Sequence, residues 1–122
     1  MTEELVTLET AKLLKEKGFN EYCKNVIDID NILSETLYRT NDNLPKQCFS
    51  LPIQSIAQKW LRETKNLHIT IYNSASGYTY DISKADMGTV LYCFPEGPND
   101  AGNWNTYEEA LEAGIIKALK LI

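Results

Sequence analysis

Residues 106–122, TYEEALEAGIIKALKLI, predict an amphipathic helix that must lie against an apolar surface. Thr106 and Glu109 have the spacing of a capping box. Glutamates fill the first half, and Lys117 and Lys120 lie near the end, so both ends suit the helix dipole. Gly114 weakens a helix interior, which predicts the close approach of another backbone. The apolar stripe consists of Tyr107, Leu111, Ile115, Ala118, Leu119 and Ile122.

Two further helices have recognisable ends. The first begins after Thr7, an N-cap residue, and stops at Gly18, with Phe19 folding back on Leu14 as in a Schellman motif. The second follows Pro52, which suits a first helical turn, and ends at Asn66. Its apolar stripe consists of Ile53, Ile56, Ala57, Trp60 and Leu61.

Pairs of β-rich runs separate these helices. Residues 22–29 and 33–39 predict a hairpin around DIDN, and LHITIYN and YTYDIS predict a second hairpin joined by SASG. The run TVLYCF, residues 89–94, predicts an additional or edge strand. The polar segment TNDNLPKQCFSL, residues 40–51, predicts a long loop.

The order is therefore α-β-β-α-β-β-(β)-α, and the fold class is α+β. We expect one antiparallel sheet of four to five strands built from hairpins, with three helices mainly on one face. No repeat or linker divides the chain, so residues 1–122 are expected to form a single domain.

Composition and charge make several classes of protein function less favourable for this chain. A formal net charge of −5 disfavours a nucleic acid partner, because phosphate neutralisation needs a basic face. No apolar run approaches the roughly 20 residues that cross a membrane. The first residues, MTEELVTLET, are acidic where a signal peptide is basic and then apolar. With Cys23, Cys48 and Cys93 expected as reduced thiols, we expect a cytoplasmic protein.

Three stretches taken together carry a resemblance: TLETAKLLKEKGF, QSIAQKWLRETKNLHITIY and TYEEALEAGIIKALKLI. In this order and spacing the chain resembles a family of small uncharacterised bacterial proteins associated with phages and prophages. The resemblance implies a phage or mobile-element context. It implies no reaction and transfers no catalytic residue.

The sequence contains no pattern that is typical of a catalytic or metal-binding site. His68 is the only histidine, and the sequence has no nucleophile elbow, phosphate-binding glycine loop or zinc-ligand spacing. DIDNILSE lacks the glycine at the turn and the chelating residue at the fifth position of a calcium loop, so Asp28 and Asp30 are interpreted as hairpin-turn residues. We therefore expect no catalytic residue, metal or cofactor, and a protein that is not an enzyme.

Aromatic residues give the candidate interaction surface. If helices cover one face of the sheet, part of the aromatic set must lie on the other, where tyrosine suits an interface. Ordinary strand propensity explains the same residues without any contact role. The leading hypothesis is a non-enzymatic module that binds a protein partner or forms a homo-oligomer through this face or an edge strand. The set consists of Tyr72, Tyr78, Tyr80, Tyr92 and Trp104.

Two alternatives remain open. One is a thiol-dependent enzyme that pairs His68 with Cys48 or Cys93, which requires a depressed thiol pKa. The other is a nucleic-acid-linked regulatory accessory protein. It is suggested by the family context and by the basic flank Lys59, Arg62 and Lys65.

Overall fold

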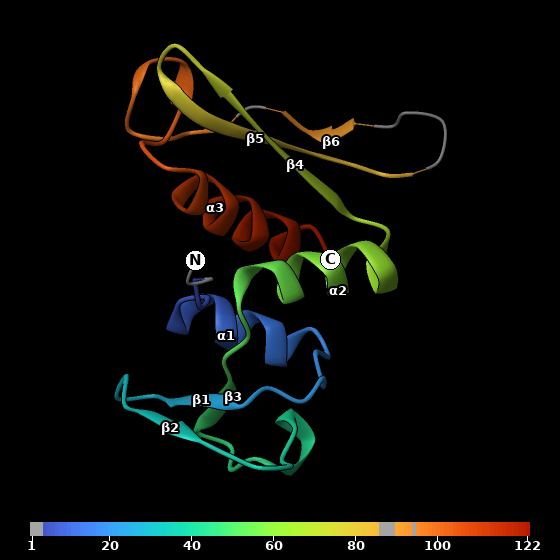
Figure 1. Cartoon of the computed structure of the whole chain (residues 1–122). Helices are drawn as coiled ribbons and strands as arrows, with labels where there is room; N and C mark the ends of the chain where they lie inside the picture. Colours follow the sequence, from blue (N-terminus) through green and yellow to red (C-terminus); the bar gives the residue numbers. More distant parts are fainter. Residues whose placement is uncertain (1–3, 86–89, 94) are drawn as a thin grey trace. The chain divides into compact units, whose positions relative to one another are not determined.

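The computed structural model describes residues 4–85, 90–93 and 95–122 of the chain (Figure 1). The chain folds as two compact units, residues 1–57 and 58–122, and the boundary falls inside a helix. The elements are, in order, α1 (Leu8–Glu16), β1 (Asn25–Asp28), β2 (Leu33–Glu35), η1 (Asn41–Asn43), β3 (Cys48–Ser50), α2 (Gln54–Lys65), β4 (His68–Ser74), β5 (Gly77–Ser83), β6 (Val90–Tyr92), η2 (Asp100–Gly102) and α3 (Tyr107–Lys120).

The ends of α1 are those that its sequence predicts. The Thr7 hydroxyl accepts the Thr10 amide at 3.3 Å and caps the first turn. At the other end Gly18 adopts a φ of +98°, which an L side chain rarely tolerates. The Phe19 amide then donates to the Leu14 carbonyl at 2.9 Å, completing the Schellman motif. Phe19 is 1% exposed, so the cap also anchors the core of this unit.

The first unit contains a three-stranded antiparallel sheet in the order β2-β1-β3, and α1 packs against β3 and β1. The loop predicted over residues 40–51 is wrong in part, because this segment contains η1 and the strand β3. Asn41 organises it from a buried position. Its side-chain amide donates to the Phe19 carbonyl at 2.6 Å and accepts the Ser50 amide at 2.8 Å. Such long-range amide bonds leave no local sequence pattern.

The turn between β1 and β2 confirms the interpretation of its aspartates. One Asp28 carboxylate oxygen accepts the amides of Asp30 and Ile32 at 2.8 and 3.0 Å. Asn31 adopts a left-handed φ of 65°, a conformation that asparagine tolerates better than most residues. The Asp28 side chain is therefore used to hold the hairpin turn.

The second unit holds a separate antiparallel sheet in the order β4-β5-β6. β4 and β5 pair along their whole length, from His68 opposite Ser83 to Ser74 opposite Gly77, which confirms the second predicted hairpin. β6 pairs with the end of β5 through a register shift at Ile82 and Ser83. The ends of the predicted strand 89–94 lie outside the described residues.

α3 packs against β4 and β5 with its buried side chains, which include Leu111, Ile115 and Leu119. A Cβ on Gly114 would lie 2.9 Å from Ile69 Cγ2 and 3.2 Å from Tyr80 Cγ. The glycine thus leaves room for side chains of β4 and β5. The sequence had instead suggested that another backbone approaches α3 at this position. The two ends of the predicted stripe, Tyr107 and Ile122, are 42% and 43% exposed, because the packed contact covers only the middle of the helix.

α2 ends where its sequence predicts, at Asn66 with a left-handed φ of 53°. Gln58 on this helix donates its side-chain amide to the Ile69 carbonyl at 2.9 Å. Ile56 differs from prediction, since it is 39% exposed although its place in the apolar stripe predicts burial.

The α+β class, the antiparallel pairing and the order of elements are confirmed. The single sheet of four to five strands is wrong, because the strands divide into two three-stranded sheets. The third strand of the first sheet comes from the segment predicted as a loop. That these residues form one domain stays a prediction.

Candidate interaction surfaces

Three of the five predicted interface residues meet in one aromatic cluster within residues 58–122. The Tyr80 ring stacks on Tyr92 at a centroid distance of 6.1 Å, and Trp104 lies 5.5 Å from Tyr80. Lys117 of α3 places its ammonium 4.3 Å from the Tyr92 centroid. Tyr80 is 4% exposed. The cluster therefore lies on the sheet face that α3 covers, and its buried centre is not a contact surface.

The other two residues lie apart from the cluster. Tyr78 forms an edge-on contact with Tyr107 at 6.2 Å, again on the α3 side. Tyr72 lies opposite Thr79 in the β4–β5 ladder, on the other face, and is 46% exposed. The structure therefore places Tyr72 on the face away from α3.

Strand alternation explains this division. Side chains two residues apart on a strand share a face, so Tyr78 and Tyr80 share the face of Ile82, which is fully buried. The sequence YTYDI carries that signal, because its alternate residues are all large and include an isoleucine. The pattern favours a covered face, and the aromatic content alone does not distinguish the two faces.

Burial changes the acidity of Tyr80. Desolvation raises the pKa of its phenol from 10.0 to about 12, with smaller contributions from Tyr92 and Glu96. The phenol therefore stays protonated at neutral pH. This is the behaviour of a packing residue, and a proton-transfer group that works near neutrality needs a pKa near the operating pH.

The cysteines and His68 are the residues that the thiol-enzyme alternative requires. Burial, followed by the charge of Glu21, raises the pKa of Cys23 from 9.0 to about 11, which suppresses the reactive thiolate. Cys48 is half-buried and Cys93 is exposed. His68 Nε2 lies 3.0 Å from Asn66 Oδ1, within hydrogen-bond distance. The same Asn66 oxygen accepts the Ala85 amide at 3.2 Å.

The described residues offer no clustered metal ligands. Within residues 4–85, 90–93 and 95–122, no group of three or more histidine, cysteine, aspartate or glutamate side chains is placed to hold an ion. Across the same ranges no helix has the length and apolar character to cross a membrane.

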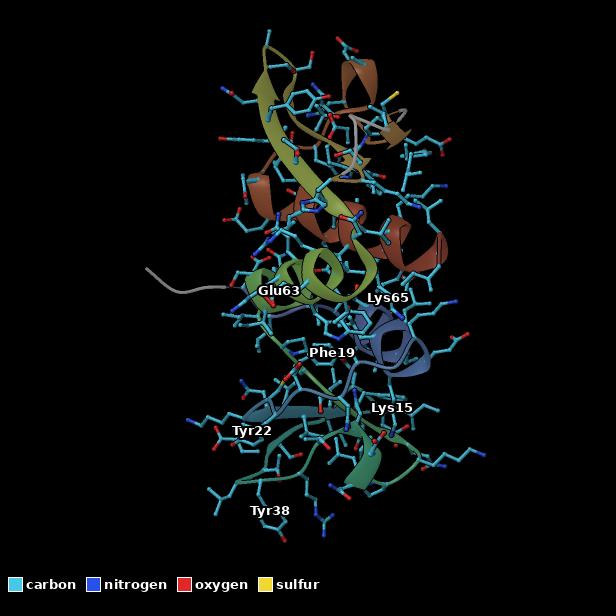
Figure 2. All side chains as sticks on the ribbon, turned by 90° about the vertical axis from the view of Figure 1, so that its right-hand side faces the viewer. Lys15, Phe19, Tyr22, Tyr38, Glu63 and Lys65 are labelled. Atoms are coloured by element: carbon cyan, nitrogen blue, oxygen red, sulfur yellow. The ribbon has the colours of Figure 1, made fainter. Side chains whose placement is uncertain are left out.

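The basic flank of α2 is engaged in part with its own helix. Lys59 lies 4.0 Å from Glu63 in an exposed i,i+4 pair. Lys65 places its ammonium 5.7 Å from the ring centroid of Trp60. Figure 2 labels both Glu63 and Lys65 on this helix. Such exposed pairs contribute only a fraction of a kcal/mol, so the flank is a solvated face with one local cation–π contact.

Residues 1–57 also carry several exposed apolar side chains in and around the β1–β2 hairpin. They come from the β1–β2 turn, from β2 and from the residues next to it. Tyr22 joins them because its hydroxyl donates to the Thr36 carbonyl at 2.7 Å. Figure 2 labels Tyr22 and Tyr38 in this part of the unit. We call this set the hairpin surface: Tyr22 (48% exposed), Ile29 (50%), Ile32 (61%), Leu33 (60%), Leu37 (90%) and Tyr38 (74%).

The backbone at the hairpin surface also has unpaired strand positions. The amides of Asp28 and Thr36 donate across the β1–β2 ladder, to Ile32 and Lys24. In an antiparallel pair such bonded positions alternate with positions that point outward, so Leu33 and Glu35 direct their N–H and C=O groups away from β1. β2 is the terminal strand of the sheet in the described part of the chain.

An apolar groove lies beside this edge. It has a volume of about 570 Å³ and includes Leu33 among its lining residues. Leu5 and Leu8 contribute from the start of the unit, and Ile27 and Leu51 from the sheet side. The hairpin surface thus combines exposed apolar side chains, outward backbone groups and a groove. Sequence reasoning missed it because apolar residues in a β-rich run are normally interpreted as core.

No family model, curated protein or solved structure matches the chain significantly.

Proposed function

We propose that this chain is a non-enzymatic protein-binding module that self-associates by pairing the β2 edge with the β2 edge of a second copy. The observation that carries the proposal is the outward backbone of Leu33 and Glu35 beside the hairpin surface. Exposed apolar side chains beside an open strand edge are typical of an interaction site.

β2 has three residues and carries Glu35, two features that limit edge pairing, but it lacks others that natural edge strands use. Natural edges are protected by lysine, proline or a bulge, and residues 33–38, LSETLY, contain neither lysine nor proline. The β1–β2 register is regular from Asn25 opposite Glu35 to Ile27 opposite Leu33. Glu35 itself has a cation nearby, since Lys24 lies 3.6 Å from its carboxylate. The negative charge of Glu35 at the β2 edge is therefore partly balanced by Lys24.

Symmetry and charge select one register for the pairing. A two-fold axis at Ser34 places Leu33 of each copy opposite Glu35 of the other and uses all the outward backbone groups of both residues. An axis at Glu35 would instead place two carboxylates directly opposite each other, which destabilises a sheet. The product would be a continuous six-stranded sheet in which the two hairpin surfaces adjoin.

Sedimentation velocity over a rising concentration series tests the proposal. We expect the wild-type chain to move from monomer to dimer, and Leu33→Asp to remain monomeric at every concentration. Val90→Asp is the matched control, because Val90 is an exposed strand residue (55%) in the other unit. A monomeric wild type up to high micromolar concentration contradicts the proposal, as does an equal loss of dimer in the control.

The biological context is a separate part of the proposal. A role as an accessory protein of phage or mobile-element type rests on the resemblance of the three sequence stretches alone. Neighbouring genes of phage or integrase type would support it, and a conserved setting among housekeeping genes would contradict it.

The two alternative functions have their own tests. Rapid labelling of Cys48 or Cys93 at neutral pH, reduced by His68→Ala, would favour the thiol enzyme. Retardation of DNA or RNA in a low-salt gel, lost in Lys59→Glu, would favour the nucleic-acid hypothesis.

A further inference from the structure

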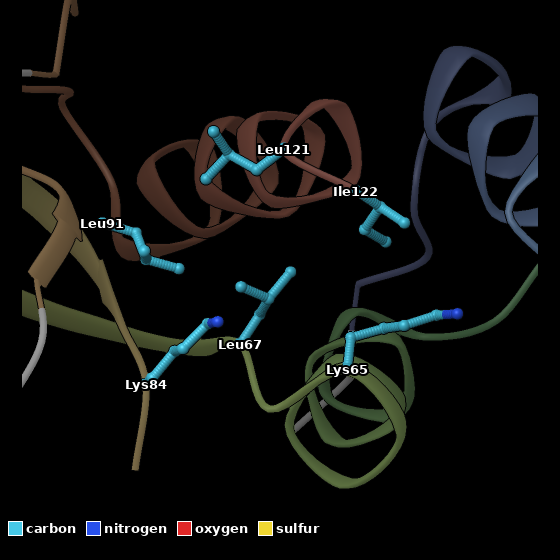
Figure 3. Close-up of a pocket in the computed structure, with 6 residues that line it drawn as sticks. All are labelled: Lys65, Leu67, Lys84, Leu91, Leu121 and Ile122. Atoms are coloured by element: carbon cyan, nitrogen blue, oxygen red, sulfur yellow. The ribbon is translucent and has the colours of Figure 1, made fainter. Parts of the chain in front are cut away.

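A hollow in the second unit has a composition unlike the rest of the chain. It has a volume of about 300 Å³ and is lined by Lys65, Leu67, Lys84, Leu91, Leu121 and Ile122 (Figure 3). These residues come from the end of α2, the start of β4, the segment after β5, β6 and the residues after α3. The volume falls at the lower end of the range for small-molecule sites.

The apolar part of the hollow has a buried floor and an exposed rim. Leu67 is 5% exposed and forms the floor. Leu91 (37%), Leu121 (42%) and Ile122 (43%) remain open to solvent around it. Figure 3 shows Leu67, Leu91 and Leu121 directed toward one another. A ligand with an apolar body would remove this surface from water.

The charges of the hollow oppose the charge of the chain. The sequence has 17 acidic and 12 basic side chains, yet the lining residues that the structure describes include two lysines and no acid. The Lys84 ammonium points toward Leu67 and Leu91, whereas the Lys65 side chain extends away from them (Figure 3). Lys65 places its ammonium over Trp60, so its stem lines the hollow and Lys84 supplies the charge.

The position of Lys84 is fixed through the backbone beside it. The amide of the next residue, Ala85, donates to Asn66 Oδ1, which joins the end of β5 to the start of β4. His68 shares the same oxygen. These bonds hold the base of the Lys84 side chain near Leu67 while its ammonium stays exposed to a ligand.

From this geometry we infer that the hollow binds a small amphipathic anion: an apolar chain against Leu67, Leu91 and Leu121, and a carboxylate at Lys84. The inference is independent of the proposed self-association, since none of these residues belongs to the hairpin surface.

Titration with decanoate, followed by ¹⁵N–¹H NMR and calorimetry, tests the inference. We expect amide shifts to concentrate at Leu67, Lys84, Leu91 and Leu121, and decanoate to bind more tightly than decanol or decylamine. Shifts spread evenly over the chain, or equal affinity for all three compounds, would overturn it. Comparing the three compounds distinguishes a site that selects a negative charge from a surface that binds any apolar chain.

Substitutions test whether Lys84 supplies the positive charge that binds the carboxylate. Lys84→Glu is expected to weaken decanoate binding by roughly threefold or more, and Lys84→Arg to retain it. Lys12→Glu, an exposed lysine on α1 outside the hollow, is the control for net charge. Leu91→Ser tests the apolar part, and circular dichroism of each variant checks folding. An unchanged affinity in Lys84→Glu, or an equal loss in Lys12→Glu, would refute the role of Lys84.

Discussion

The two units contain similar parts and bury their apolar strand residues differently. Each has a three-stranded antiparallel sheet and a helix that packs on it. In the second unit α3 has 14 residues, a length of about 21 Å, and covers Tyr80 on the central strand. In the first unit α1 has 9 residues, about 13.5 Å, and packs against β3 and β1. β2 keeps Leu33 exposed. The strand residues that become core are those on the strands that the helix contacts, since Val90 on β6, the terminal strand of the second sheet, is also 55% exposed.

The largest expected effect compares the same substitution in the two units. Tyr80→Ala should destabilise the protein by about 3–5 kcal/mol, because it removes a buried ring that touches Tyr92 and Trp104. Tyr38→Ala, at 74% exposure, should change the free energy of unfolding by less than about 0.5 kcal/mol. Urea unfolding of both variants measures the difference. Similar losses would mean that the two units bury their tyrosines alike.

Gly114 tests how closely α3 approaches its sheet. Gly114→Val should destabilise by about 1–3 kcal/mol, because the new side chain overlaps Ile69 and Tyr80. Ala113→Val is the matched control on the neighbouring, partly exposed position, where only the small helix-propensity difference applies. Thermal unfolding compares them. Equal losses would show that α3 packs on its sheet more loosely than the structure describes.

The helix caps offer a symmetric comparison between the units. Thr106 accepts the Glu109 amide at 3.1 Å, and Thr7 accepts the Thr10 amide at 3.3 Å. Replacing either threonine by alanine should cost about 1 kcal/mol, and serine should restore most of it. Chemical denaturation measures both. A loss confined to one helix would show that the other cap contributes little.

A further expected effect is a decline of stability at alkaline pH. The folded chain raises the pKa of Cys23 from 9.0 to about 11 and that of Tyr80 from 10.0 to about 12. Both groups are neutral when protonated, so the folded state holds their protons more tightly than the unfolded state. Stability is therefore unaffected by these groups below pH 9.0 and falls as pH rises through these intervals. Urea midpoints across this range, repeated for Cys23→Ala, measure the thiol part. A midpoint that rises with pH would contradict both assignments.

Much of the fold was predictable because local chemistry determines it. Thr7, Gly18 and Asn66 mark helix ends through bonds and dihedral angles that involve only nearby residues. SASG and the Asp28 turn mark hairpins in the same way. What was missed depends on distant partners. β3 is a strand because it pairs with β1, and Asn41 binds the Phe19 carbonyl and the Ser50 amide. The spacing of residues in the sequence does not reveal these distant partners.

The candidate surfaces were harder to predict than the helices. Alternation placed Tyr78, Tyr80 and Ile82 together, and the burial of Ile82 decides that their face is covered. Leu33 and Leu37 belong to a β-rich, apolar run that resembles core in the sequence. Their exposure follows from packing, because α1 packs against β3 and β1. The hollow around Lys84 likewise combines residues from separate segments of the chain.

A designed disulfide tests the pairing of β2 most directly. Ser34 lies on the proposed two-fold axis, at a non-hydrogen-bonded position where Cα atoms are about 4.5 Å apart, within the disulfide range of about 4.4–6.8 Å. In a Cys93→Ser background, which removes the exposed thiol, Ser34→Cys is compared with Asn43→Cys, an exposed position in η1. Under mild oxidation we predict that the Ser34→Cys chain becomes a covalent dimer rapidly, and the Asn43→Cys chain slowly. Equal rates for the two variants, or no dimer from Ser34→Cys, would contradict the proposed pairing.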